Sequence, residues 1–504
     1  MKSSEELMVQ KLRTGIEGFD SLSHGGLPMG RTTLLSGTAG SCKTVFAVQF
    51  LAGGIEQFKE SCVFVTFEEQ PEDIRQNMLS FGWEIEAWEE QGHWRFVDAS
   101  QMAKENSVIN GSFDLHALLS RVEHAVKQVG AKRVSIDSLG AVFSTFNDHQ
   151  MVRQELLQIA LKLKSLKVTA LMTAERLEEY GAIARHSIEE FVADNVIILR
   201  NVLDSENRRR TMEILKFRGT NHQKGEYPFT IVANGGIIAV PLSSVPLDHR
   251  SSNVRTTSGS HNLDAMCNGG FFRDSIVLIS GATGTGKTLM STSFIGGSQE
   301  NERGLFFAFE ESRDQLFRNA EGWGVDFAGM EAEGRLKVIC AYPESTGLEE
   351  HLIKMQQAIV EFSPTRVAVD SLSALERGSS AKSFREFVIG ITSFIKNREI
   401  VGVFTSVTPS LMGGASITDA HISTITDSII LLRYVELFGE ISRGIAVLKM
   451  RGSHHEKQIR QFTIDDLGMS IGKPFSNITG ILTGNPQFFE RGESERLHDL
   501  FDNL

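Results

Sequence analysis

The chain has 504 residues, which is enough for two or three domains that each bury their own core. Hydrophobic residues make up 41% of it and charged residues 23%, as in ordinary soluble proteins, and no run of 18 apolar residues predicts a membrane span. The net charge of −12 argues against a mainly nucleic-acid-binding role, and four scattered cysteines with no N-terminal signal segment favour a cytoplasmic protein.

The first segment that predicts chemistry is a glycine-rich loop at 37–44, which reads G-T-A-G-S-C-K-T after an apolar run. It follows the P-loop pattern except at Cys42, where the pattern has its last glycine. In such a loop successive backbone N–H groups surround an anion at the N-terminus of a helix. If position 42 needs a positive φ, the Cβ of Cys42 costs about 1–3 kcal/mol. We therefore expect ATP binding here with an altered affinity.

A second loop at 281–288 reads G-A-T-G-T-G-K-T and matches the P-loop pattern at every specified position. The two loop lysines lie 244 residues apart, so nucleotide binding is expected in each half of the chain. The lysines would contact the β- and γ-phosphates, and Thr44 and Thr288 would hold Mg²⁺. The loop residues expected to bind ATP are Gly37, Thr38, Gly40, Ser41, Cys42, Lys43 and Thr44 in the first half, and Gly281, Thr283, Gly284, Thr285, Gly286, Lys287 and Thr288 in the second.

Other segments of the two halves recur at a constant offset of 233 positions, which indicates a duplication. Short apolar, β-rich runs alternate with amphipathic stretches such as 151–167 and 348–361, a pattern typical of parallel strands joined by crossover helices. The predicted fold is α/β, with two tandem RecA-like P-loop domains that each hold a mostly parallel twisted sheet flanked by helices. The expected boundaries are 1–240 for the first domain, 241–258 for a linker rich in Pro, Ser and Thr, 259–484 for the second domain and 485–504 for a tail.

Acidic residues follow the apolar strands of both halves. Asp137 and Asp370 each end such a strand and suit a Mg²⁺-aligning role, although a helix N-cap is the alternative. The pairs Glu68-Glu69 and Glu310-Glu311 follow the strand after each P-loop helix. Adjacent acids raise one another's pKa, which helps a general base, and the alternative is a solvated strand end.

Two basic pairs, Lys216 with Arg218 and Lys449 with Arg451, lie far from the loops in sequence. In a ring of subunits such residues can contact a neighbour's γ-phosphate, like an arginine finger, and are then ATP-binding. Alternatively they are strand-end cations on a solvated surface. The sequence leaves these two interpretations open.

With these motifs in place, the chain resembles the KaiC family of RecA-like circadian-clock ATPases and autokinases over nearly all of its length. The most specific segments are 309–316, F-E-E-S-R-D-Q-L, 341–345, A-Y-P-E-S, and 416–427, S-I-T-D-A-H-I-S-T-I-T-D. The resemblance implies a cytoplasmic double-ring homohexamer that binds ATP and Mg²⁺ at subunit boundaries. The N-terminal tier would hydrolyse ATP, with Glu68 and Glu69 preparing water.

By the same resemblance the C-terminal tier phosphorylates itself across the subunit interface. The acceptors would be Ser423 and Thr424, with Thr418 as an auxiliary acceptor, and Glu310 would be the general base beside Glu311. Arg377 and Arg385 match positions that line this interface. The offset of 233 places Glu190 and Phe191 opposite the acceptors, so the first half has no hydroxyl at either position.

The resemblance also implies partners. Residues 110–115, N-G-S-F-D-L, look like the family's KaiB-contacting region, and a histidine-kinase output partner is a further expectation. The tail is short and acidic where the family carries its KaiA-binding tail, so dependence on a KaiA-like protein stays open. Neither a membrane nor a nucleic-acid partner is expected. The alternatives are a RadA-like recombination ATPase, which would need basic DNA-binding loops, and a nucleotide-gated scaffold.

Overall fold

A computed structural model describes residues 9–100, 115–140, 149–184, 192–204, 207–240, 251–408, 424–437, 439–476, 478–482 and 487–488. The chain divides into two compact units, Met1–Ser244 and Val245–Leu504, and each is described by itself. No helix among these residues has the length and apolar character needed to cross a membrane. The exact domain boundaries expected from the sequence stay a prediction.

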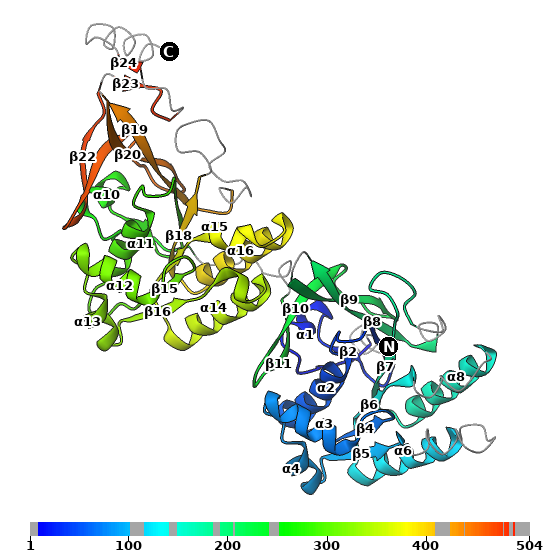
Figure 1. Cartoon of the computed structure of the whole chain (residues 1–504). Coiled ribbons are helices and arrows are strands. Elements are labelled where there is room, and N and C mark those ends of the chain that lie inside the picture. Colours follow the sequence, from blue (N-terminus) through cyan, green and yellow to red (C-terminus); the bar gives the residue numbers. More distant parts are fainter. Residues whose placement is uncertain are drawn as a thin grey trace, which may run out of the picture. The chain divides into compact units, whose positions relative to one another are not determined.

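The first unit is built on one nine-stranded sheet (Figure 1), with the strand order β11-β10-β9-β8-β3-β7-β6-β4-β5. Within this order neighbouring strands from β8 to β5 pair in parallel, and neighbouring strands from β8 to β11 pair antiparallel. The strands of this unit are β1 (Lys11–Leu12), β2 (Leu27–Pro28), β3 (Thr32–Gly37), β4 (Cys62–Thr66), β5 (Trp94–Asp98), β6 (Arg133–Asp137), β7 (Thr169–Glu175), β8 (Asn195–Asp204), β9 (Asn207–Phe217), β10 (Glu226–Val232) and β11 (Gly236–Ala239). Its helices are α1 (Phe19–Leu22), α2 (Lys43–Phe58), α3 (Pro71–Met78), the 3₁₀ turn η2 (Leu79–Phe81), α4 (Ile85–Glu90), α6 (Leu115–Val129) and α8 (His149–Ser165).

Helices cover both faces of this sheet because its central strands are apolar on both sides. Successive side chains of a strand point to opposite faces, so Leu35 joins the core under α2 whereas Leu34 joins the core under α6 and α8. Parallel pairing brings the carboxyl ends of β3, β4 and β6 to one edge. The first P-loop, the Glu68-Glu69 pair and Asp137 therefore lie at that edge.

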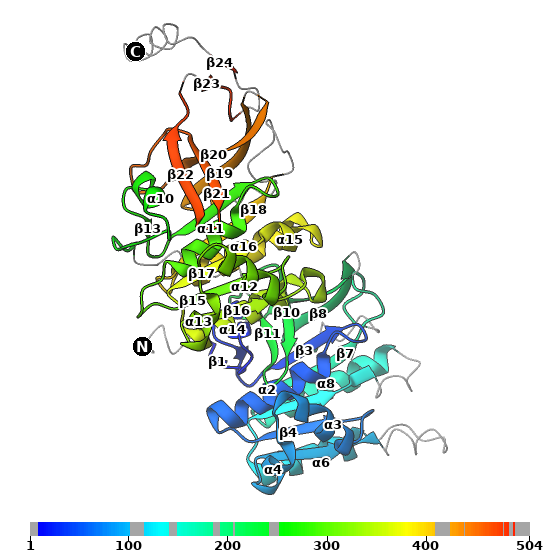
Figure 2. The same ribbon diagram turned by 60° about the vertical axis from the view of Figure 1, so that its left-hand side comes forward.

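The second unit repeats this plan, and Figure 2 shows its sheet from another side. Its strand order is β16-β15-β17-β18-β14-β19-β20-β21-β22, parallel from β16 to β19 and antiparallel from β19 to β22. The strands are β12 (Arg255–Thr256), β13 (Phe271–Phe272), β14 (Ile276–Gly281), β15 (Gly304–Ala308), β16 (Leu336–Cys340), β17 (Arg366–Asp370), β18 (Val401–Val407), β19 (Ser428–Leu437), β20 (Glu440–Met450), β21 (Arg460–Asp465), β22 (Gly468–Pro474), β23 (Ile478–Thr479) and β24 (Gln487–Phe488). The helices are α10 (His261–Met266), α11 (Lys287–Gly296), α12 (Arg313–Gly322), α13 (Phe327–Ala332), the 3₁₀ turn η4 (Pro343–Ser345), α14 (Leu348–Phe362), α15 (Leu372–Arg377) and α16 (Ala381–Lys396).

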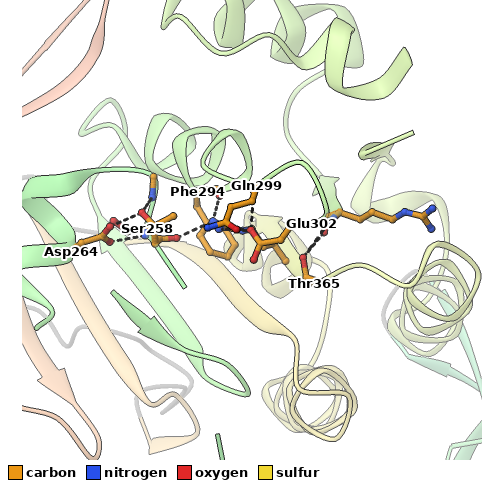
Figure 3. A network of polar contacts seen from close by, with 10 residues as sticks. Ser258, Asp264, Phe294, Gln299, Glu302 and Thr365 are labelled. Carbon is orange, nitrogen blue, oxygen red and sulfur yellow. Dashed lines mark hydrogen bonds and ion pairs between the residues drawn. The ribbon is translucent and has the colours of Figure 1, made fainter. Parts of the chain in front are cut away.

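The predicted fold class is confirmed, since each unit is a mostly parallel sheet flanked by helices. A buried arginine occupies the same place in both units, Arg133 at the start of β6 and Arg366 at the start of β17. Each guanidinium pairs with a glutamate and donates to backbone carbonyls of the segment that precedes the sheet. Figure 3 shows part of this network in the second unit, where Glu302 accepts from the N–H of Gln299 at 3.0 Å.

Candidate functional site

Both phosphate loops connect a buried strand to a helix, as the sequence predicts. The first runs from β3 into α2 and the second from β14 into α11. The residue before each helix adopts a left-handed conformation, with φ 71° at Cys42 and φ 103° at Gly286. Gly286 meets no Cβ penalty there, whereas Cys42 carries the strain of about 1–3 kcal/mol expected for a side chain in this region.

The Cys42 side chain turns back onto its own loop. Its Sγ lies 3.5 Å from the carbonyl oxygen of Gly40. Burial raises the pKa of the thiol, and the neighbouring Arg210 offsets this effect only in part. Cys42 is therefore a neutral thiol near neutral pH, and its effect on the loop is steric and conformational.

The loop lysines point into their loops. Lys43 Nζ donates to the carbonyls of Gly37 and Thr38 at 3.0 and 2.9 Å, and Lys287 Nζ donates to that of Ala282 at 2.9 Å. Burial lowers the pKa of both lysines, and nearby carboxylates act in the opposite direction. Each ammonium group thus lies next to the backbone of its own loop, whose N–H groups can surround a phosphate.

The loop threonines contact the strand-end aspartates in both halves. Thr44 Oγ1 donates to Asp137 Oδ2 at 2.7 Å, and Thr288 Oγ1 donates to Asp370 Oδ2 at 2.6 Å. The second carboxylate oxygen accepts from Thr173 in the first half and from Thr405 in the second. Asp370 is buried, and burial raises its pKa. These two supporting threonines were not predicted from the sequence.

The glutamate pairs lie beside the aspartates. Ser138 Oγ donates to Glu68 Oε1 and Ser371 Oγ donates to Glu310 Oε2, both at 3.0 Å. In the second half Arg377 also forms an ion pair with Glu310. Burial, followed by the charge of the strand-end aspartate, raises the pKa of Glu69 and of Glu311.

A cavity of about 1080 Å³ joins these groups in the second unit. The predicted residues that line it are Thr283, Gly284, Gly286, Lys287, Thr288, Glu310, Glu311, Asp370 and Arg377. Sequence reasoning missed the other lining residues, which are Leu289, Asn319, Trp323, Ser373, Glu376, Val407, Ile464 and Arg443. The repeat carried a signal for the last of these, because Arg443 lies 233 positions after Arg210, the arginine next to Cys42.

The predicted basic pairs lie elsewhere in each unit. Lys449 and Arg451 are at the end of β20, and neither is among the described residues that line the cavity. Their side chains instead contact the segment before β19: Lys449 Nζ donates to the Thr426 carbonyl at 2.7 Å, and Arg451 Nη2 donates to the Thr424 carbonyl at 2.8 Å.

The first-unit pair has a similar place, with Lys216 Nζ donating to the Ala193 carbonyl at 2.9 Å. Arg218 lies at the same end of β9, and Arg385 is exposed on α16. Of the predicted acceptors, Thr424 is exposed. Ser423, Thr418 and the segment 110–114 lie outside the described residues.

Comparison with known proteins decides the family. The family model for the KaiC ATPase matches the chain twice, at residues 12–244 and 256–476. The chain belongs to the KaiC family. It is 63% identical over 495 residues to the circadian clock protein KaiC3 of Synechocystis sp., and the match covers 98% of each chain.

Other curated relatives are also named KaiC. The circadian clock oscillator protein KaiC of Thermostichus vulcanus is 56% identical over 479 residues, which are 95% of this chain and 92% of that protein. The protein of the same name from Synechococcus elongatus is 54% identical over 485 residues, or 96% of this chain and 93% of its own. The chain is thus a KaiC-type, ATP-binding ATPase with a duplicated RecA-like domain, and the resemblance inferred from sequence is confirmed.

Proposed function

We propose that this KaiC-family chain divides two reactions between its halves. The first half hydrolyses ATP, with Glu68 and Glu69 preparing the water, and the second half is a Ser/Thr autokinase and autophosphatase that modifies Ser423 and Thr424, with Thr418 as a weaker site. The observation that carries the proposal is the second-unit cavity, in which the P-loop, Asp370 and Glu310 converge, in the half that also has the acceptor hydroxyls.

The chemistry assigned to the second half follows from its polar groups. Glu310 is exposed, and its two oxygens are oriented by Ser371 and Arg377. It can accept the proton of a hydroxyl as the hydroxyl oxygen bonds to the γ-phosphorus and the bond to the β-phosphate oxygen breaks, releasing ADP. Lys287 compensates the phosphate charge. Thr288 and Asp370, and in the first half Thr44 and Asp137, are suited to hold Mg²⁺, which would neutralise charge on the β- and γ-phosphates.

Action across a subunit boundary accounts for the basic pairs. Lys449 and Arg451 are remote from the cavity of their own unit, so we assign them, with Lys216 and Arg218, to the ATP of a neighbouring subunit. This requires a heterologous interface that closes into a ring, and we propose a cytoplasmic homohexamer. Arg385, exposed on α16, is suited to the same interface.

A timing role is proposed from the clock names of the relatives. A KaiB-like protein is the expected partner, and a histidine kinase the expected output. Dependence on a KaiA-like protein stays open, because the tail is short and acidic.

Site-resolved labelling tests the kinase assignment. Purified protein is incubated with γ-labelled ATP and Mg²⁺, and the label is mapped by mass spectrometry. We expect label on Ser423 and Thr424 that falls about 10²–10⁴-fold in Glu310→Gln, the range for loss of a general base. The matched variant Glu68→Gln should keep the label. Absence of incorporation in the wild type, together with hydrolysis strongly stimulated by single-stranded DNA, would instead favour a RadA-like ATPase.

A further inference from the structure

Lys396 and Asp427 form an ion pair of the second unit that has no role in the functions above. Asp427 lies three residues after the acceptor Thr424 and directly before β19. Lys396, in the last turn of α16, donates from Nζ to Asp427 Oδ1 at 2.9 Å, and its Nζ lies 2.7 Å from Asp427 Oδ2. The two side chains are only 14% and 17% exposed. This ion pair is therefore shielded from solvent more than a surface pair is, and it is worth more than one.

The same aspartate fastens the acceptor segment to the strand that leads into the P-loop. Asp427 Oδ2 accepts from the Ile276 N–H at 2.9 Å, and the Asp427 N–H donates to the Ile276 carbonyl at 2.9 Å. Ile276 is the first residue of β14, which ends at the phosphate loop. The segment that follows Thr424 and the strand that leads into the P-loop are thus held in a fixed position relative to each other.

Asp427 also orients Arg451. Arg451 Nη1 lies 3.7 Å from Asp427 Oδ1, and its Nη2 donates to the carbonyl of Thr424. A chain of contacts therefore runs from Lys396 through Asp427 and Arg451 to the backbone of the acceptor. Lys396 supplies the closer positive charge to Asp427, which leaves Arg451 oriented toward Thr424.

The first half has the same residues without the ion pair. Lys164 matches Lys396, since each lies three residues before a residue with a positive φ, Lys167 at 57° and Glu399 at 56°. The backbone hydrogen bonds Lys167 N–H to Lys164 O and Glu399 N–H to Lys396 O are both 3.0 Å long. Lys164, however, is exposed, and no ion pair joins it to a described residue.

The matched aspartate of the first half keeps its other contacts. Asp194 lies 3.7 Å from Arg218, and its N–H donates to the Thr32 carbonyl at 3.1 Å. The lysine–aspartate pair is thus a feature of the half that has the acceptor hydroxyls. It is built from residues that the duplication supplied to both halves.

We propose that Lys396 and Asp427 are positioning residues for self-phosphorylation, acting through Arg451 to fix the backbone of Thr424. This inference rests on the proposed kinase function. Without the Lys396 charge, Asp427 draws Arg451 toward itself, and the Thr424 carbonyl loses its donor. The acceptor then departs from the geometry required for transfer, while the ATP cavity, lined by other residues, keeps its shape.

The test compares Lys396→Met with its matched control Lys164→Met and with the conservative variant Lys396→Arg. We expect the initial rate of self-labelling in Lys396→Met to fall about tenfold, well within the loss that a misplaced reacting group produces. The KM for ATP should change less than the labelling rate does, because the phosphate-loop lysine and threonine of the second unit keep their contacts. The fraction of label on Thr424 relative to Ser423 should fall as well. Lys164→Met should behave as the wild type, and Lys396→Arg should recover most of the rate.

Amide hydrogen exchange supplies a readout that does not depend on activity. Exchange of residues 424–430 should quicken in Lys396→Met and stay unchanged in Lys164→Met. Asp427→Asn removes the carboxylate charge that orients Arg451 but keeps an acceptor for the Ile276 N–H. Loss of this orientation should also lower the labelling rate and quicken the exchange, so this variant serves if Lys396→Met fails to fold. Wild-type labelling and exchange in these variants would overturn the proposal. If the wild-type protein takes up no label, the proposed kinase function is wrong instead. The exchange data then test by themselves whether Lys396 holds residues 424–430 in place.

Discussion

The two halves of this KaiC-family chain share the elements of a nucleotide site and differ at a few positions, two beside the phosphate loop and one at the opposite end of the strand that leads into it. Both place a P-loop, a threonine–aspartate contact and a glutamate at the same sheet edge. They differ at the residue before the P-loop helix, at the arginine that pairs with Glu310 and at the lysine that holds the acceptor segment. Duplication has thus kept the groups at the nucleotide site, whereas the halves differ in the loop, in the partner of the proposed catalytic glutamate and at the amino end of the P-loop strand.

The largest expected effect tests the shared frame. The Arg366 side chain is 1% exposed and satisfies Glu302, which is 11% exposed, together with the carbonyls of Thr257 and Phe294. Arg366→Ala leaves Glu302 buried without its cation, so the free energy of unfolding of the second unit should fall by about 3–5 kcal/mol.

Arg133→Ala is the matched variant, and it should cost the first unit less. Its partner Glu60 is 26% exposed and can recover hydration. Denaturant unfolding of the full chain, followed by exchange in peptides of each unit, measures both losses. Equal losses would contradict this account of the difference in burial.

The phosphate-loop lysines test whether the two reactions separate. Lys287→Ala should lower self-labelling by at least about 100-fold, the effect of removing one group that stabilises the transferred charge. Lys43→Ala should lower ATP hydrolysis and leave most of the labelling. Turnover and label are measured on the same samples, and a variant pair that loses both activities together would break the proposed separation.

Substitutions of the residue before each P-loop helix should have smaller effects. These effects on ATP affinity should be opposite in sign in the two halves. Cys42→Gly removes a side chain from a left-handed position, so first-half ATP affinity should rise by up to about 5- to 150-fold if a strain of about 1–3 kcal/mol opposes binding. Gly286→Cys should weaken the second site, because φ at this position is 103°, a backbone conformation that residues with a side chain rarely adopt. Titration calorimetry of each variant resolves the two sites, and unchanged affinity in Cys42→Gly would show that the strain is relieved elsewhere.

The smallest expected effect concerns Asp370. Burial of this side chain raises its pKa. The folded protein holds the Asp370 proton more firmly than the unfolded chain does, so this group stabilises the fold in acid and the contribution is lost as pH rises through the folded pKa. At neutral pH Asp370→Asn should therefore raise the Tm of the nucleotide-free protein, because the amide removes a buried negative charge.

That gain should vanish in acid, and the variant should lose its stabilisation by ATP with Mg²⁺. Scanning calorimetry over a pH series checks both effects. Asp137→Asn, at a half-buried position, should change the Tm less. A Tm that falls at neutral pH would contradict the sign.

The sequence predicted the nucleotide site shared by both halves well, because the motifs that form it are local in sequence. A glycine-rich loop between an apolar strand and a helix fixes Lys43 and Lys287, and strand ends fix Asp137 and Asp370 at the same edge. Contacts between distant segments left no local pattern, and so the Arg377–Glu310 pair, Trp323 in the cavity and Thr405 on Asp370 were missed. The pairing of Lys396 with Asp427 could not be predicted either, because Lys164 occupies the matched position without making it.

The separation of the two reactions is tested most directly by measuring ATP turnover and site-resolved label together in Glu68→Gln and Glu310→Gln. The account predicts a crossed result: Glu68→Gln loses most of the turnover and keeps label on Ser423 and Thr424, whereas Glu310→Gln loses the label and keeps most of the turnover. Label that persists in Glu310→Gln, or disappears in Glu68→Gln, would contradict it.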